Sequence, residues 1–244
     1  MENKKLYSVN INGMGKYTGG EFDCVNIAGT GKVEGNVKCN ELNVSGTIAI
    51  NGDLASKVST VSGTAKVGGD LFGDDLTVSG MLKAIGSGMV KNVTINGMMM
   101  LEKTFKVRRL ENNGSIKVDG DLSGEQIYSN DMIECSGLLN CENLELRLSG
   151  VSHVHEIGAT TIKVEEGNSG VGGLLSFLIP KRYKNNQLVV TTIEGDEIYL
   201  ENCEVEVVRG KHITIGPNCN IKTIEYIETL AVDDKSIVKN SMRQ

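Results

Sequence analysis

The chain of 244 residues contains 30 glycines, two prolines and no tryptophan, a composition that suits thin, regular turns better than a large irregular core. Its net charge of −6 argues against a nucleic-acid partner, because a protein that binds nucleic acid is expected to present a basic stripe. The N-terminus lacks the apolar stretch of a secretory signal. We therefore expect a cytoplasmic protein whose six cysteines are reduced thiols.

Residues 1–26 are expected to form an entry turn or two. Tyr7, Val9 and Ile11 alternate as the buried residues of a strand do. No amphipathic helix or polar loop stands before this pattern to cap the end, which favours end-to-end association of copies. These three residues are therefore the predicted polymerisation surface at the N-terminal tip.

Seven consecutive segments of 17 residues run from Ile27 to Glu145 without a gap. Glycine occupies the third position in six of them and the ninth position in six, as expected where a corner needs positive φ or close backbone approach. Apolar residues predominate at positions one, seven, eleven and sixteen, and those within a run lie two apart. The pattern predicts an all-β fold, a single-stranded parallel β-helix with about 17 residues per turn.

The remaining chain divides by its composition. The repeats extend over residues 1–166, with the main block at 25–145, and residues 167–187 form a glycine-rich, apolar and then basic excursion from the solenoid. Turns are predicted to resume over 188–238, because Ile198 and Ile215, and Val207 and Ile224, are again 17 apart. Residues 239–244 are polar and are expected to fray.

Three stretches of the repeats carry a family resemblance: VSGTIAINGDL at 44–54, VSGTAKVGGDL at 61–71 and GSIKVDGDL at 114–122. Over roughly residues 25–140 the chain resembles the bactofilin family of bacterial polymer-forming cytoskeletal proteins. The resemblance implies a right-handed β-helix of triangular section that assembles without nucleotide, with itself or with a paralogous bactofilin, as a scaffold near the cell envelope. Two departures are the turns after the excursion and the absence, in MENKKLYSV, of the family's N-terminal membrane-targeting stretch.

The last turns would expose an unpaired strand edge and an apolar cross-section to another copy. Terminal residues that fold over and cap the stack are the alternative. The predicted polymerisation surface at the C-terminal tip consists of Ile224, Tyr226, Ile227, Leu230, Val232, Ile237 and Val238.

The excursion combines an apolar cluster with a following run of cations. The apolar side chains of such a segment can insert into a bilayer interface while its cations bind anionic headgroups. The alternative is a loop that packs back over a face of the solenoid. The predicted membrane or partner contact consists of Leu174, Leu175, Phe177, Leu178, Ile179, Lys181, Arg182 and Lys184.

The sequence offers little for catalysis. His153 and His155, beside Glu156, lack a third metal ligand at a convincing spacing. The stretch ITIGPNCNI after His212 is similar to the hexapeptide repeats of left-handed β-helix acyltransferases, but those enzymes use 18 residues per turn. We therefore expect a non-enzymatic scaffold with no cofactor, metal or nucleotide, cytoplasmic and in peripheral contact with a membrane; the alternatives are an acyltransferase-like enzyme and a monomeric adaptor.

Overall fold

The computed structural model describes residues 6–167 and 186–244, and these residues form strands and no helix. The chain divides into two compact units, which are described one at a time. Unit 1 comprises Met1–Leu110 and Gly114–Gly120, and unit 2 comprises Glu111–Asn113 and Asp121–Gln244. Strands in both units pair parallel with the strand one turn later, so the predicted β-solenoid is confirmed.

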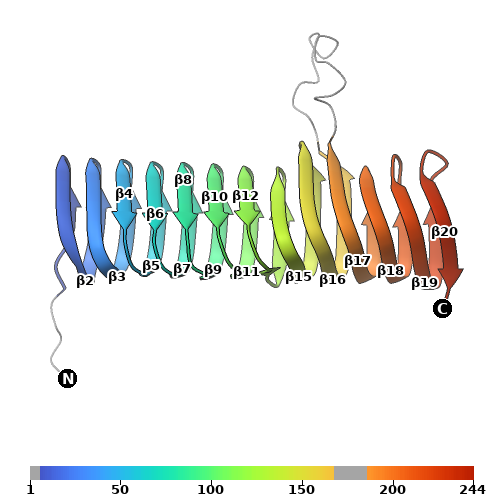
Figure 1. Cartoon of the computed structure of the whole chain (residues 1–244), viewed down its shortest axis with the longest axis horizontal. Coiled ribbons are helices and arrows are strands. Elements are labelled where there is room, and N and C mark those ends of the chain that lie inside the picture. Colours follow the sequence, from blue (N-terminus) through green and yellow to red (C-terminus); the bar gives the residue numbers. More distant parts are fainter. Residues whose placement is uncertain (1–5, 168–185) are drawn as a thin grey trace, which may run out of the picture. The chain divides into compact units, whose positions relative to one another are not determined.

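The strands are numbered in chain order, and Figure 1 labels most of them. Those of unit 1 are β1 (Val9–Ile11), β2 (Met14–Ile27), β3 (Thr30–Val44), β4 (Thr47–Ile50), β5 (Leu54–Val61), β6 (Thr64–Val67), β7 (Leu71–Val78), β8 (Met81–Ala84), β9 (Gly88–Ile95), β10 (Met98–Leu101) and β12 (Ser115–Val118). Strand β11 (Phe105–Asn112) begins in unit 1 and ends in unit 2. Those of unit 2 are β13 (Leu122–Ser123), β14 (Gln126–Ser129), β15 (Ile133–Leu148), β16 (Val151–Glu166), β17 (Gln187–Leu200), β18 (Cys203–Ile215), β19 (Asn220–Val232) and β20 (Ile237–Arg243).

One turn of unit 1 consists of a short strand, a corner and a longer strand. In β4 and β5 the buried side chains alternate with outward ones, except at Lys57 and Val58, where two successive residues point outward. This pair marks a third corner inside β5, because a straight strand alternates strictly. Each turn therefore has three short faces around a core of stacked aliphatic residues, such as Ile50, Val67 and Ala84.

Glycine at the third position of the repeat is required by close approach of the backbone. A Cβ on Gly63 would lie 2.0 Å from the carbonyl oxygen of Gly46, and one on Gly80 would lie 2.0 Å from that of Gly63. Neither glycine has a positive φ. Of the two reasons that the sequence left open, close approach is the one that applies here.

Glycine at the ninth position leaves room for a side chain of the preceding turn, the one at the tenth position. The Asn36 Oδ1 accepts a hydrogen bond from Asp53 N at 2.9 Å, and Asp53 Oδ1 accepts one from Asp70 N at 2.8 Å. A Cβ on Gly69 would lie 2.1 Å from Asp53 Oδ1. The repeated Gly-Asp pair thus satisfies a corner N–H in the next turn.

The register of unit 2 corrects part of the sequence-based prediction. Ile198 pairs with Ile213, which is 15 residues later, and not with Ile215. Ile224 pairs with Val208, not with Val207. The turn from β17 to β18 is shorter because its corner is a tight one, in which Asn202 adopts the left-handed conformation at φ 52°.

The predicted frayed tail is also wrong for residues 239–243, which belong to β20. Strand β20 pairs with β19 from Asn220↔Ile237 to Tyr226↔Arg243, and Gln244 N donates to Tyr226 O at 2.9 Å. Polar composition predicted fraying, but the hydrogen bonds to β19 hold this stretch as a strand.

The third-position glycines give a direct test of the stacking. We expect Gly63→Ala to lower the free energy of unfolding by about 1–3 kcal/mol, because the new Cβ meets backbone that has no room to move. Gly13→Ala is the matched control, since a Cβ on Gly13 would have no atom within 4 Å. Urea unfolding followed by circular dichroism measures both; equal stability of the two variants would contradict the close-approach explanation.

Candidate functional site

The last strands of unit 2 expose apolar side chains at positions that are buried one turn earlier. Val232 pairs with Ile215, yet Val232 is 43% exposed and Ile215 only 1%. Leu230 pairs with Ile213 and is half-buried. Strand β20 lies on Asn220–Tyr226 of β19, so within residues 186–244 the stretch 228–232 lacks that cover.

The other predicted residues of the C-terminal tip fall into two groups. Ile227 and Ile237 are 49% and 62% exposed, and Tyr226 and Val238 are half-buried. Ile224 is 0% exposed beneath Ser241 of β20, so it belongs to the core and does not present its side chain at the tip.

The first strands of unit 1 differ from these last strands. Val9 and Ile11 are buried, pairing with Val25 and Ile27 of β2. Tyr7 is exposed, and its ring meets that of Phe22 edge to face at 5.3 Å. Of the three residues predicted for the N-terminal tip, only Tyr7 therefore offers its side chain to a partner.

The predicted membrane or partner contact at 174–184 lies outside the described residues, but both flanks of that segment are described. Gly167 N donates to Leu148 O at 2.9 Å, and Gln187 N donates to Gly150 O at 3.0 Å. Gly150 N in turn donates to Asn186 Oδ1 at 2.9 Å. The two flanks are thus both fixed to the corner between β15 and β16.

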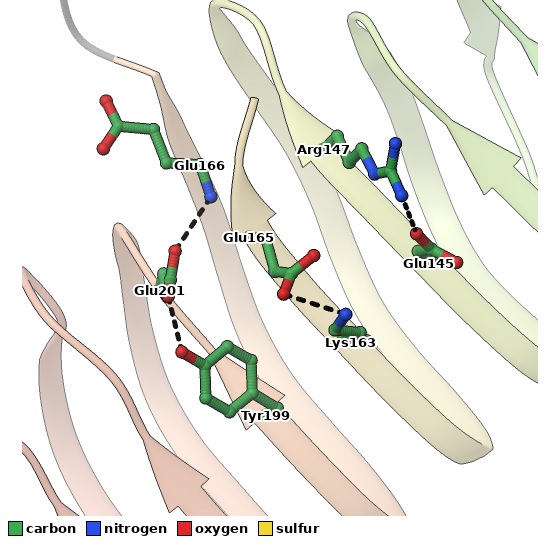
Figure 2. Close-up of polar contacts among 7 residues, drawn as sticks. All are labelled: Glu145, Arg147, Lys163, Glu165, Glu166, Tyr199 and Glu201. Atoms are coloured by element: carbon green, nitrogen blue, oxygen red, sulfur yellow. Dashed lines mark hydrogen bonds and ion pairs between the residues drawn. The ribbon is translucent and has the colours of Figure 1, made fainter. Parts of the chain in front are cut away.

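A row of polar contacts reinforces this corner (Figure 2). Glu201 accepts hydrogen bonds from the Tyr199 hydroxyl and, at 3.0 Å, from Glu166 N. Arg147 pairs with Glu145 at 2.9 Å, and Lys163 pairs with Glu165 at 2.8 Å. Glu145 lies opposite Lys163 in the strand register, and Arg147 lies opposite Glu165, so opposite charges face each other both along and between the turns.

These contacts shift two pKa values. The hydrogen bond to Glu201, together with desolvation, raises the pKa of Tyr199 to about 12. The hydrogen bond to Glu165 raises the pKa of Lys163. Sequence reasoning missed the Tyr199–Glu201 contact, because two residues two apart in a strand give no signal until the corner between them is known.

Two of the three histidines have polar partners. His155 Nε2 lies 3.8 Å from Glu156, and His153 lines a groove of about 590 Å³ on unit 2. His212 Nδ1 lies 3.0 Å from the Thr229 hydroxyl, and its Nε2 lies 3.4 Å from Glu228. Across the described part of the chain, no group of three or more His, Cys, Asp or Glu side chains is arranged to hold a metal ion.

Five of the six thiols are buried. Desolvation raises the pKa of Cys141 to about 12, and burial also raises the pKa of Cys39 and Cys135. A thiol with a raised pKa is a poor nucleophile at neutral pH. No helix formed by residues 6–167 or 186–244 is long and apolar enough to span a bilayer.

Two proteins of Bacillus subtilis (strain 168) are similar to part of the chain. The uncharacterized protein YhbF is 44% identical over 107 residues, which are 43% of this chain and 41% of YhbF. The uncharacterized protein YhbE is 34% identical over 107 residues, 43% of each chain. The match thus spans less than half the length of these curated relatives. No family model and no solved structure matches the chain.

The Tyr199–Glu201 hydrogen bond predicts a late step in the alkaline titration. Since the bond requires the protonated phenol, its contribution to stability is present below the pKa of about 10 for an unfolded tyrosine and is lost as pH rises through about 12. Absorbance at the tyrosinate band should show one of the six tyrosines ionising last, a step absent from Tyr199→Phe. Glu201→Gln, which removes the carboxylate but keeps an acceptor, should move that step towards about 10.

Titration curves of the same shape in wild type and Tyr199→Phe would rule the contact out. Circular dichroism reports whether each variant keeps its fold over the titration.

Proposed function

We propose that the protein is a non-enzymatic scaffold that assembles end to end into filaments without nucleotide, in the cytoplasm near the cell envelope. The observation that carries the proposal is the exposed apolar surface at the last turns of unit 2. Its partners would be other copies of itself or a paralogous bactofilin, as the family resemblance implies.

Each turn is stabilised by the turns stacked on either side of it. In the interior of the stack, an inward aliphatic side chain such as Ile215 is covered on both sides, and such burial stabilises by about 1.5–3 kcal/mol per residue. Val232 occupies the same column with one side uncovered. A strand of another copy laid on 228–232 would bury Val232 and Leu230 and pair the free backbone edge.

On this proposal, assembly needs no nucleotide. Hydrophobic burial and strand pairing are available as soon as two copies meet, so no hydrolysis step is required to create a binding-competent state. The same surfaces would let the protein serve cell shape, envelope organisation or motility as a scaffold. Peripheral membrane contact through residues 174–184 belongs to the same proposal.

An acyltransferase-like enzyme and a monomeric adaptor are the competing functions. The enzyme would use the surroundings of His212, whose ring is already engaged by Thr229 and Glu228. The adaptor would bind a partner on one face of the solenoid. Both predict discrete particles of fixed size, whereas the scaffold predicts particles whose length grows with protein concentration.

Negative-stain electron microscopy without nucleotide or metal tests the scaffold. We expect filaments of the wild type, and their loss in Ile227→Lys/Val232→Lys, because each new charge would be buried in the contact. Both side chains are exposed, so the variant should fold, whereas a charge at the buried Ile224 would disrupt the core.

Phe72→Lys is the matched control, because Phe72 is equally exposed at 42% but lies on β7 of unit 1. It should leave the filaments unchanged. Monomers or trimers of the wild type at every concentration would refute the scaffold and favour the enzyme or the adaptor.

A further inference from the structure

The two units carry opposite net charge. Unit 1 has 14 Lys and Arg against 11 Asp and Glu, a net charge of +3, whereas unit 2 has 11 against 20, a net charge of −9. The whole-chain value of −6 conceals this difference. Charge segregated in this way produces an attraction between the basic unit of one copy and the acidic unit of another.

The strands of one face of unit 1 carry positive charge only. Strands β4, β6, β8, β10 and β12 lie side by side and contain no Asp or Glu (Figure 1). One outward column of this face, extended back into β3, follows the strand register. We call it the lysine row; it consists of Lys32, Ala49, Lys66, Lys83, Met100 and Lys117.

The lysine row costs unit 1 stability. Lys66 and Lys83 are directly opposite each other on β6 and β8, and like charges in that position repel. Lys83 is partly compensated by Glu102 at 2.7 Å and Lys32 by Glu34 at 2.8 Å. Within the described residues, Lys66 has no carboxylate within ion-pair distance, so its charge is open to a partner.

In unit 2 a groove of about 660 Å³ carries the opposite charge. Its lining includes four residues that place no long side chain in the groove: Gly158, Ala159, Gly195 and Gly210. Its acidic residues are Glu156, Glu194, Asp196 and Glu225, against the two cations Arg209 and Lys211.

Both cations of the groove are already used within unit 2. Arg209 pairs with Glu225 at 2.9 Å, and Lys211 pairs with Asp196 at 2.9 Å. Glu194 is exposed and has no cation within ion-pair distance among the described residues, and Glu156 has only His155. Two carboxylates thus remain available along the groove, as Lys66 does on the lysine row.

We propose that the lysine row of one copy docks in the acidic groove of a second copy. The aliphatic stems of the lysines would lie over the glycines of the groove, while their ammonium groups meet Glu194 and Glu156. The contact joins two different surfaces, so it is heterologous, and it can repeat from copy to copy into an open assembly. This inference rests on the self-assembly proposed above and adds a second contact, between side faces of the copies, to the contact proposed at 228–232.

Charge reversal and charge exchange test the contact by sedimentation velocity of the full chain. Lys66→Glu/Lys83→Glu should weaken self-association roughly tenfold, and Glu156→Lys/Glu194→Lys should weaken it similarly. The variant that combines all four changes should recover most of the wild-type association, because the two surfaces then attract again with exchanged signs. Raising the salt from about 0.05 to 0.5 M should weaken the wild-type assembly, since screening shortens the reach of the attraction.

Lys57→Glu/Lys91→Glu is the matched control. It also reverses one lysine, Lys57, that forms no ion pair with the described residues and one that is paired, Lys91 with Asp74 at 2.7 Å, but these lie on β5 and β9. It should leave association within about twofold of wild type. Circular dichroism and thermal unfolding report whether each variant folds, and a Lys66→Gln/Lys83→Gln variant replaces the reversal if that one does not.

The outcomes separate the two proposals. Wild-type protein that stays monomeric at all concentrations overturns self-assembly itself. Wild-type protein that assembles, while the lysine-row variant behaves like the control or the four-fold exchange fails to restore association, overturns only the docking of the lysine row in the groove.

Discussion

The structure depends on backbone hydrogen bonding between successive turns in a parallel register. A strand of four residues such as β4 has no stability alone, and it is held because every turn repeats the same path one strand spacing further on. That repetition forces the corners to approach closely. The carbonyl oxygen of Gly46 lies where a Cβ on Gly63 would be, so a side chain at this corner would require the backbone to move.

At the second corner, which contains the ninth-position glycine, a side chain satisfies a backbone N–H group. Asp53 and Asp70 each accept a hydrogen bond from the main chain of the next turn, which satisfies an N–H group that the bend removes from the strand ladder. The missing Cβ of the ninth-position glycine leaves the space for that carboxylate. The Gly-Asp pair is therefore a structural device of the turn, and its repetition does not indicate a metal or catalytic site.

A stack stabilised by its neighbours is least satisfied at its last turns, and the function proposed here follows from that. Val232 lies in a column whose other members are covered on both sides, so the proposed association of copies would extend the interaction that already holds each unit together. Charge would give this association a preferred orientation. A basic unit 1 and an acidic unit 2 favour contact between unlike surfaces over contact between like ones, which is the arrangement that extends rather than closes an assembly.

The sequence by itself determined the β-solenoid, its period over residues 27–145 and the glycine corners, because identical turns must present identical residues in identical columns. The tertiary structure decided what varies between turns: the corner inside β5, the shortened turn at Asn202, the burial of Ile224 under β20 and the Tyr199–Glu201 contact. Each of these features depends on how many residues form a particular corner. The local backbone conformation and the strand that covers the corner set this number, and neither can be read from the spacing of apolar residues.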